Sequence, residues 1–332
     1  SNAVNRMINR ALDGGTYRGL NTDAQAIIQS SATHRVQLGQ SLTRGLGAGG
    51  NPSIGQKAAE ESRADLQQAL EGVDLVFIAA GMGGGTGTGA APVVAQVAKE
   101  SGALTVGIVT KPFSFEGKRR LRQADEGIAR LAENVDTLIV IPNDRLKDVI
   151  SGAPLQEAFR SADDVLMKGV QGISDIITFP GLVNVDFADV RSVMTEAGSA
   201  LLGIGLGSGR SRALEAAQAA INSPLLEAAR IDGAKGCVIN ITGGKDMTLE
   251  DMTSASEVIS DVVDPEANII VGTVVDEKLE GEIQVTVIAT GFDSNQIYSN
   301  ERTRARLSPQ SLYEQTESRE AGASIPDFFR LR

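Results

Sequence analysis

A glycine-rich segment follows an apolar run in the first third of the chain. Residues 75–80 read Leu-Val-Phe-Ile-Ala-Ala, and residues 81–89 read Gly-Met-Gly-Gly-Gly-Thr-Gly-Thr-Gly before a helical pattern that begins near Ala90. Such a turn between a strand and a helix N-terminus gathers backbone N–H groups and lets an anion approach closely. A plain strand–helix turn needs far fewer glycines. The segment therefore predicts a phosphate site, to which Thr86 and Thr88 add hydroxyl donors.

A second glycine-rich segment, residues 45–50, matches the pattern G-x-G-x-x-G. It is followed by Asn51-Pro52, which favours a turn over the close helix start of a dinucleotide-binding fingerprint. The pattern G-x-x-x-x-G-K-[ST] of ordinary P-loop NTPases is absent from the sequence. Two glycine-rich loops in one domain suggest two walls of a single phosphate site.

Composition excludes several other classes of protein. The chain has 332 residues, a formal net charge of −11, one cysteine and one histidine. The net negative charge argues against extensive electrostatic binding of nucleic acid, which requires clustered positive charge. The lone Cys237 excludes a disulfide framework and a cysteine zinc site, and His34 alone leaves little room for a histidine-ligated metal or a Ser-His-Asp triad. No uncharged apolar run reaches the ~18 residues of a membrane span. We therefore expect a soluble protein of a reducing compartment, with no direct membrane insertion.

The elements that must position these loops alternate between strand and helix. Residues 75–80, 104–109 and 137–141 are apolar on both faces, as buried parallel strands are, and helical patterns cover 56–70, 90–100 and 118–133. A long helical pattern follows at 155–177. Beyond Pro180 the sequence predicts a second, smaller α/β domain, with strands at 201–206, 236–241, 269–275 and 283–289 and helices at 212–221 and 249–262.

These patterns predict an α/β protein with a parallel-sheet, Rossmann-like domain at 1–153, a long central helix at 154–178 and a second domain at 179–293. Residues 294–324 are rich in Ser, Glu, Gln, Arg and Thr, which predicts a flexible linker. Residues 325–332 read Ile-Pro-Asp-Phe-Phe-Arg-Leu-Arg. A compact apolar patch at the end of such a linker indicates a peptide that docks on a partner.

The motifs together resemble the tubulin/FtsZ family, and within it the FtsZ proteins, the bacterial and plastid division GTPases. The resemblance rests on Gly-Gly-Gly-Thr-Gly-Thr-Gly at 83–89, and it extends in order over nearly the whole chain, through Asn-Thr-Asp at 21–23, residues 45–52, Lys-Pro-Phe-Ser-Phe-Glu-Gly at 111–117, Ile-Pro-Asn-Asp at 141–144, Asn-Val-Asp-Phe-Ala-Asp-Val at 184–190 and the tail at 325–329. The tail is similar to the C-terminal peptide of FtsZ rather than to that of any tubulin.

The resemblance implies a GTP/GDP site, with Mg²⁺ accompanying the nucleotide phosphates. Phosphate contacts are implied for the signature loop, and nucleotide contacts near the ribose and phosphates for Glu116 and Arg120. From the residues alone, the latter two are an i, i+4 salt bridge on a helix. Guanine recognition is implied for Asn143 and Asp163, with Phe159 against the base or in the core. The full set of nucleotide-binding residues is Asn2, Asn21, Ala48, Gly49, Gly50, Asn51, Gly81, Gly83, Gly84, Gly85, Thr86, Gly87, Glu116, Arg120, Asn143, Phe159 and Asp163.

Asn184, Asp186 and Asp189 carry the implied catalytic role. By spacing alone, Asp186 and Asp189 suit the capping of a helix that begins near Asp186. The family resemblance instead implies a loop that enters the nucleotide pocket of the neighbouring subunit. There its acids position and polarise the water that attacks the γ-phosphate. Hydrolysis then depends on head-to-tail assembly, in the cytoplasm at a mid-cell division ring or, for a plastid homologue, in the stroma. Residues 325–332 are expected to bind membrane-tethering and regulatory division proteins.

The beginning of the sequence departs from the family pattern. It opens within a helical pattern, whereas the resemblance places an apolar strand and a first glycine-rich loop ahead of Asn2. Without that strand we expect unpaired backbone groups and an empty slot in the core. One alternative follows, a non-hydrolysing filament or scaffold subunit that is impaired by the missing strand and works through its tail. A separate alternative is a dinucleotide-dependent oxidoreductase built around residues 45–50.

Overall fold

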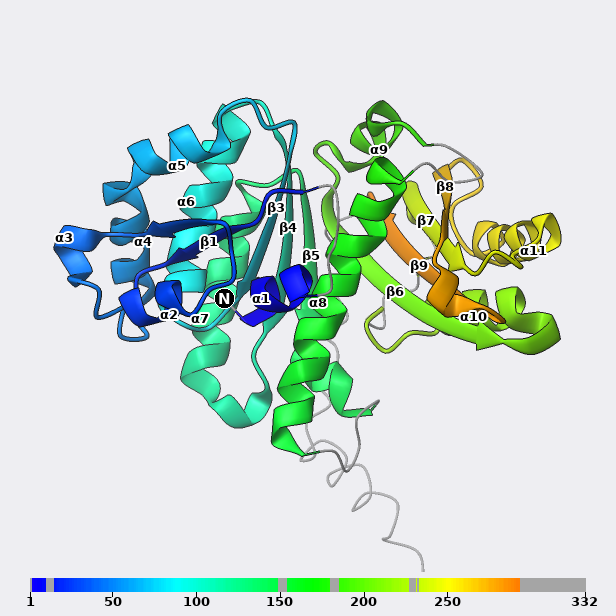
Figure 1. The fold of residues 1–332 in the computed structure, drawn as a ribbon, viewed down its shortest axis with the longest axis horizontal. Helices are drawn as coiled ribbons and strands as arrows, with labels where there is room; N and C mark the ends of the chain where they lie inside the picture. Colours follow the sequence, from blue (N-terminus) through cyan, green and yellow to red (C-terminus); the bar gives the residue numbers. More distant parts are fainter. Residues whose placement is uncertain are drawn as a thin grey trace, which may run out of the picture. The chain divides into compact units, whose positions relative to one another are not determined.

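The apolar runs of the chain pair into one seven-stranded sheet (Figure 1). In the computed structural model, which describes residues 2–9, 15–148, 154–179, 185–226, 231 and 233–292, the strand order is β3-β4-β5-β6-β9-β7-β8. The strands are β3 (Leu75–Gly81), β4 (Leu104–Lys111), β5 (Thr137–Pro142), β6 (Gly198–Ser208), β7 (Gly236–Gly243), β8 (Asn268–Val275) and β9 (Glu282–Thr290). Pairing is parallel except at β9, which is antiparallel to both neighbours. The predicted α/β fold is confirmed.

The two halves of the chain share this sheet. β5 and β6 pair in parallel through the residues Thr137–Gly198, Leu138–Ser199 and Ile139–Ala200. The chain up to Phe292 accordingly forms one compact unit. The predicted linker and tail peptide, 294–324 and 325–332, lie outside the described residues.

Helices cover the first half of the sheet. They are α4 (Pro52–Glu61), α5 (Arg63–Leu70), α6 (Thr86–Glu100) and α7 (Lys118–Ala132). The single helix predicted at 56–70 is two helices, because Ser62 leaves helical geometry and its hydroxyl accepts a hydrogen bond from the Gly39 N–H at 3.0 Å. A separate pair of parallel strands, β1 (Arg18–Asn21) and β2 (His34–Gln37), was not predicted. The short helices α1 (Asn2–Asn9), α2 (Ala24–Ile28) and α3 (Gln40–Thr43) flank this pair.

The central helix α8 (Leu155–Thr178) runs between the two halves (Figure 1). Its apolar face, which includes Leu166, Val170 and Ile173, joins one core cluster with β4, β5, β6 and β8. The approach to the second half is close, since the Asn240 side-chain amide donates to the Gly172 carbonyl at 3.1 Å. The helix thereby fixes the position of the side chains on its first turns relative to the sheet.

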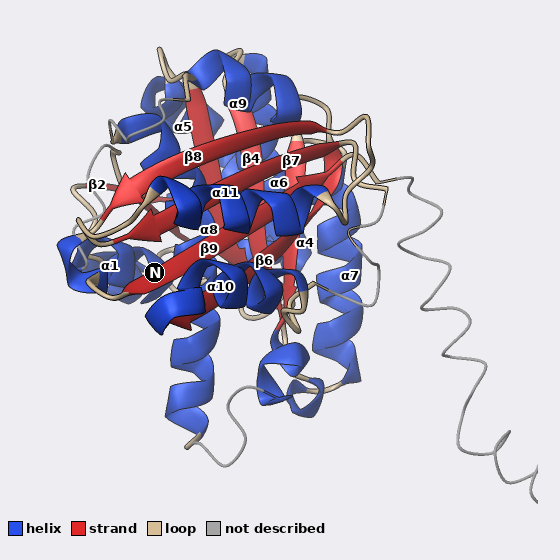
Figure 2. Ribbon diagram, turned by 90° about the vertical axis from the view of Figure 1, so that its right-hand side faces the viewer, coloured by secondary structure: helices blue, strands red, loops and turns tan. Residues whose placement is uncertain are grey.

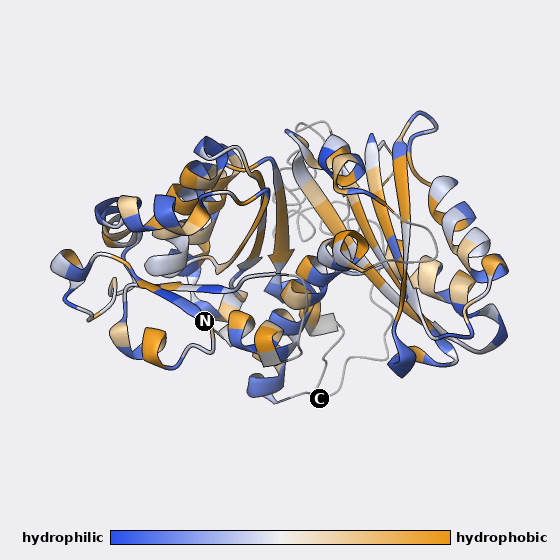
Figure 3. Ribbon diagram, turned by 45° about the horizontal axis from the view of Figure 1, so that its top comes forward, coloured by the Kyte–Doolittle hydropathy of each residue, from blue (hydrophilic) through white to orange (hydrophobic). Residues whose placement is uncertain are grey.

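The second half is layered. α10 (Arg212–Ile221) and α11 (Leu249–Ser260) lie on one face of its strands and α8 lies behind them (Figure 2). Apolar residues concentrate on these strands (Figure 3), and Ile239, Val285 and Val287 are fully buried in the cluster beneath α10 and α11. α9 (Phe187–Met194) connects α8 to β6. The short 3-10 helices are η1 (Ser114–Glu116), η2 (Asn143–Asp148), η3 (Gly209–Ser211) and η4 (Glu277–Leu279).

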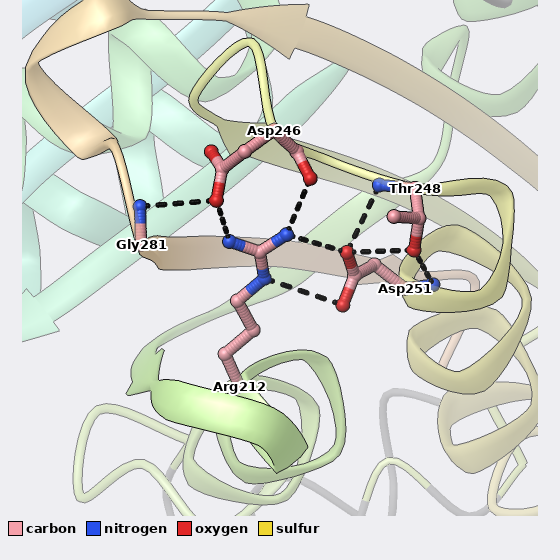
Figure 4. A network of polar contacts seen from close by, with 5 residues as sticks. All are labelled: Arg212, Asp246, Thr248, Asp251 and Gly281. Carbon is pink, nitrogen blue, oxygen red and sulfur yellow. Dashed lines mark hydrogen bonds and ion pairs between the residues drawn. The ribbon is translucent and has the colours of Figure 1, made fainter.

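A buried arginine ties three segments of the second half together (Figure 4). Arg212, which is 8% exposed, forms an ion pair with Asp246 and donates through Nη2 and Nε to Asp251 at 2.8 and 3.3 Å. Asp246 also accepts from the Gly281 N–H at 3.2 Å. These hydrogen bonds, first to Asp251 and then to Asp246, raise the pKa of Arg212 further above its already high value. The cluster therefore holds α10, the β7–α11 loop and the start of β9 together.

A cavity of about 700 Å³ lies beside β3, the edge strand of the sheet. It is lined by Phe77 of β3 and by residues of α1, β1, α5 and α8, among them Met7, Leu20, Leu70 and Val170. Its lining also includes polar residues, among them Arg18, Asn21 and Asp74. Among the described residues, no helix has the length and apolar character needed to cross a bilayer.

Candidate functional site

The turn between β3 and α6 is shorter than predicted. β3 ends at Gly81 and α6 begins at Thr86, four residues earlier than expected, so only residues 82–85 form the turn. The N–H groups of the first helical turn, beginning at Thr86 and Gly87, have no intrahelical acceptor and are potential anion donors. Gly85 at the N-cap has no side chain with which to satisfy them.

Thr88 supports this turn from inside. Its side chain is fully buried, and its hydroxyl accepts a hydrogen bond from the Gly83 N–H at 2.8 Å. Gly83 itself adopts a φ of 93°, which a residue with a side chain rarely does. Thr88 therefore fixes the shape of the turn, and its hydroxyl, which keeps a proton to donate, is fully buried in this structure.

The two glycine-rich loops lie against each other. A Cβ atom built on Gly85 would stand 2.8 Å from the Ala48 Cβ and 2.9 Å from the Asn51 nitrogen. A Cβ on Gly89 would stand 2.6 Å from the Gln56 nitrogen of α4. Gly89 is therefore required for the packing of α4 on α6, and Gly85 for the contact between the two loops. By contrast, nothing lies within 4 Å of a Cβ built on Gly49, Gly50 or Gly84, which border open space.

Asn21 and Thr22 stand at the end of β1, beside the same turn. Asn21 accepts a hydrogen bond from the Asp23 N–H at 3.2 Å through its side-chain oxygen. The hydroxyl of Thr22 lies 2.6 Å from that of Thr86. Thr22, the residue after β1, was not among the residues predicted for the site, although it belongs to the Asn-Thr-Asp motif at 21–23.

Glu116 and Arg120 form the salt bridge that their spacing suggests, with Arg120 Nη1 2.7 Å from Glu116 Oε2. The other carboxylate oxygen of Glu116 accepts from the Phe113 N–H at 3.0 Å. The pair lies beside the turn of residues 82–85, called the phosphate turn below after its predicted role, since a Cβ on Gly83 would stand 2.8 Å from the Arg120 carbonyl oxygen. The guanidinium of Arg120 is about half exposed.

Asn143 is the first residue after β5 and lies at the same edge of the sheet as the phosphate turn. Its side chain is 5% exposed, and its Oδ1 is the one buried side-chain oxygen or nitrogen in the described part of the chain without a hydrogen-bond partner. An unsatisfied buried acceptor is costly, so the site suits a ligand that donates a hydrogen bond.

Asp163 and Phe159 lie one helical turn apart near the start of α8. Burial raises the pKa of Asp163, and the nearby Arg6, whose Nε is 3.9 Å from the carboxylate, opposes that shift. Phe159 is 41% exposed and meets Phe113 edge to face, with ring centroids 5.5 Å apart. Phe159 is thus not a core aromatic. It forms part of an aromatic wall with Phe113 and Phe115.

Asp186 and Asp189 do not share this edge of the sheet. Asp186 caps α9, accepting from the Asp189 N–H at 2.9 Å, so the capping arrangement is present. α9 lies at the amino end of β4, because Arg191 donates to the Gly102 carbonyl at 3.2 Å. The phosphate turn lies at the carboxyl end of β4, where the Met82 N–H donates to the Thr110 carbonyl at 2.9 Å. β4 spans 8 residues, roughly 26 Å. One subunit therefore keeps its acids far from its own phosphate turn.

Two predicted site residues cannot be placed. Asn184 lies outside the described residues, and the side chain of Asn2, the first residue of α1, does too. Within the described ranges, no group of three or more His, Cys, Asp or Glu side chains is arranged to hold a metal ion.

Comparison with known proteins gives two family matches. Residues 1–151 match the Tubulin/FtsZ family GTPase domain, and residues 198–293 match the FtsZ family C-terminal domain. Among solved structures, an FtsZ dimer described as empty, from M. jannaschii, has a TM-score of 0.86 at 46% identity, covering 89% of this chain and 85% of that one.

More distant structures share the fold. CetZ1 from Haloferax volcanii, a GDP-bound monomer, has a TM-score of 0.76 at 18% identity, over 88% of this chain and 91% of its own. CetZ2 from the same organism, a GTPγS-bound protofilament, has a TM-score of 0.72 at 19% identity, over 92% and 94%.

Proposed function

This chain belongs to the tubulin/FtsZ family, and from that premise we propose that it is a division GTPase that assembles head to tail and hydrolyses GTP between subunits. The observation that carries the proposal is the separation described above. The phosphate turn and the Asp186–Asp189 pair occupy opposite ends of β4 in the same subunit. A heterologous, open-ended stack brings those two ends together and forms a filament.

The nucleotide is placed by two groups of residues at the carboxyl edge of the sheet. The phosphates sit on the N–H groups at the start of α6, with the hydroxyl of Thr86 and the side chain of Arg120 as further donors. Guanine lies toward Asn143 and Asp163. A carboxylate accepts from both the ring N–H and the amino group of guanine, an arrangement of donors that adenine lacks. Phe159 lies against the base.

Bound Mg²⁺ would supply charge neutralisation on the phosphates. The protein offers no cluster of three acidic or histidine ligands among its described residues. This fits an ion held mainly by phosphate oxygens and water, as Mg²⁺ usually is in nucleotide sites. The residues that border it in this proposal are those of the phosphate turn.

Hydrolysis needs a water placed in line with the γ-phosphate, and phosphoryl transfer relies mainly on such positioning and on charge. In the stack, Asp186 and Asp189 of one subunit face the phosphates bound to the next, and we assign Asn184, two positions before Asp186 in the sequence, to the same catalytic group. Asp186 already uses one carboxylate oxygen as a helix cap. Asp189 is therefore the acid we assign to orienting the water.

Phosphate release measured against protein concentration tests the proposal. We expect turnover per subunit to rise steeply where light scattering shows assembly with GTP, and scattering to stay low with GDP. Turnover per subunit that stays constant from dilute monomer to polymer would overturn the shared site.

A second candidate is a filament subunit that binds nucleotide without hydrolysing it. The cavity of about 700 Å³ favours it, because it lies beside β3, the strand that leads into the phosphate turn. Filaments with GTP but without phosphate release would select this candidate. For either one, we propose a cytoplasmic location at the division ring and a tether bound through residues 325–332.

A further inference from the structure

Thr22 is a fully buried residue whose hydroxyl faces the phosphate turn. Its Oγ1 lies 2.6 Å from the Oγ1 of Thr86, the first residue of α6, and the side chain is 0% exposed. The two residues are 64 positions apart in the chain. The contact joins the end of β1 directly to the start of α6.

The surrounding loop holds Thr22 in place. Its carbonyl oxygen accepts hydrogen bonds from the Gly47 N–H and from the Thr43 hydroxyl, both at 3.2 Å. Thr43 is itself buried, and its hydroxyl shares its one proton between the Thr22 carbonyl and the Gly39 carbonyl, which is 2.9 Å away. The hydroxyl of Thr22 is thus presented to Thr86 by a rigid backbone rather than by a free side chain.

A phosphate bound to Thr86 would fix which of the two hydroxyls, Thr22 or Thr86, is the donor of the hydrogen bond between them. Each threonine hydroxyl carries one proton and two lone pairs, so the 2.6 Å contact uses the proton of one partner only. Phosphate oxygens at neutral pH are acceptors, so Thr86 must give its proton to the phosphate. The Thr22 hydroxyl must then donate to Thr86 Oγ1. A side chain without a hydroxyl at position 22 leaves Thr86 Oγ1 without its hydrogen-bond donor.

We propose that Thr22 is a positioning residue of the phosphate site: its buried hydroxyl donates to Thr86 and holds the Thr86 hydroxyl aimed at a nucleotide phosphate. This rests on the proposed function, since it assigns Thr86 to a phosphate. Thr22 touches no nucleotide in this arrangement. Thr22 restricts the rotation of the Thr86 hydroxyl. The hydrogen bond that it donates also polarises this hydroxyl and makes it a stronger donor to the phosphate.

The test compares Thr22→Val, which keeps the shape and removes the hydroxyl, with Thr22→Ser, which keeps the hydroxyl. We expect Thr22→Val to weaken GTP and GDP binding about five-fold, the effect of one neutral hydrogen bond, and Thr22→Ser to bind nearly as the unmodified chain does. Guanosine, which has no phosphate, should bind all three alike. Thr22→Ala answers the same question if Thr22→Val fails to fold.

A double-mutant cycle with Thr86→Val completes the test. If the hydroxyls act as a pair, Thr22→Val should add little once Thr86 has lost its own hydroxyl. Equal GTP affinity of Thr22→Val and the unmodified chain would overturn the inference, and so would an equal loss of guanosine binding, which indicates a structural role. Failure of the unmodified chain to bind GTP would refute the proposed function instead.

Discussion

The carboxylate of Asp186 accepts a hydrogen bond from the backbone N–H of Asp189 at 2.9 Å. The two acids therefore have different positions in the fold. Asp186 begins α9 as its N-cap, whereas Asp189 lies exposed in the first turn of the helix. Substitutions at Asp186 combine a structural effect with any catalytic one, but Asp189 can be changed with less effect on the helix.

Asp189→Ala should leave GTP binding by isolated subunits unchanged and lower hydrolysis about a hundred-fold or more, because the water loses the group that positions it. Binding and phosphate release measured on the same preparation check this. Asp186→Asn is the matched comparison: it keeps the cap, whereas Asp186→Ala should cost about 1 kcal/mol of stability as well.

Mixing two inactive variants should restore turnover. Thr86→Arg fills the phosphate turn and should not bind GTP, yet it still presents Asp189 to its neighbour. Added to Asp189→Ala subunits under assembly conditions, it should restore phosphate release from the GTP that they hold. A mixture no more active than its separate components would count against catalysis between subunits.

Asp163→Asn should shift the base preference of the site from guanine toward xanthine. An amide at this position donates where the carboxylate accepts, so GTP affinity should fall about ten-fold or more, and xanthosine triphosphate should bind better than it binds the unmodified chain. Calorimetry with the two nucleotides measures both changes. The control is Asp164→Asn. Asp164 forms an ion pair with Arg6 at 2.7 Å, so this variant disturbs Arg6, which also faces Asp163, without changing Asp163 itself. Unchanged GTP affinity in Asp163→Asn would remove this residue from the base site.

Asp175 should make stability depend on pH. It is 4% exposed on α8, and burial raises its pKa to about 6, with a hydrogen bond to Gln171 opposing and repulsion from Asp276 adding to the shift. The folded state therefore binds this proton more tightly than the unfolded state does. The contribution to stability is fully present below about pH 4 and is lost as the pH rises to about 6.

At pH 7.5, Asp175→Asn should accordingly have a free energy of unfolding up to about 3 kcal/mol higher than that of the unmodified chain, measured by urea denaturation. This gain in stability should shrink steeply between pH 6 and pH 4. Glu257→Gln, an exposed change on α11, is the control and should show no such trend. A gain independent of pH would indicate a packing effect rather than a titrating carboxyl.

The cavity beside β3 predicts a gain in stability when it is filled. An apolar strand with a glycine-rich loop of the family type, placed ahead of Asn2, should raise the melting temperature, since each buried Val, Leu or Ile contributes about 1.5–3 kcal/mol. GTP should bind more tightly at the same time, because the family resemblance implies that the added loop also contacts the phosphates. A Gly/Ser segment of equal length is the control. Equal behaviour of the two fusions would show that the cavity does not accept a strand.

Deletion of residues 325–332 should abolish binding to a tether and leave assembly and GTP turnover unchanged. The expected contact is an apolar one through Phe328 and Phe329, which in the sequence follow a segment predicted to be a flexible linker. Co-sedimentation of filaments with and without the tether measures it, and Phe328→Ala with Phe329→Ala tests the side chains alone. Loss of polymerisation on deletion would make the tail part of the filament contact.

Regular, buried elements were predictable from the sequence, and special local contacts were not. β4, β5 and the long helix follow from apolar runs and 3.6-residue periodicity, and their ends agree with prediction within a few residues. The break at Ser62 was not foreseen, since it depends on a hydrogen bond to Gly39. β1 and β2 were missed because strands of 4 residues carry little periodicity.

The candidate site divides in the same way. The glycine-rich turn and Asn143 stand directly after strands, where sequence patterns indicate function. The buried link from Thr22 to Thr86 joins residues 64 positions apart, and no local pattern reports such a contact. The orphaned oxygen of Asn143 is likewise a property of its surroundings and not of its residue type.

The glycines that pack α4 onto α6 affect how genetic data on this loop can be interpreted. A screen for inactive mutants will recover substitutions at Gly55, Gly85 and Gly89, where an added methyl group meets backbone atoms at or below 3 Å. Those mutants report on helix packing, so their loss of function says nothing about nucleotide. Gly84, where an added methyl group would meet no atom within 4 Å, is the informative site. An inactive, fully folded Gly84→Ala would be direct genetic support for a ligand in that space.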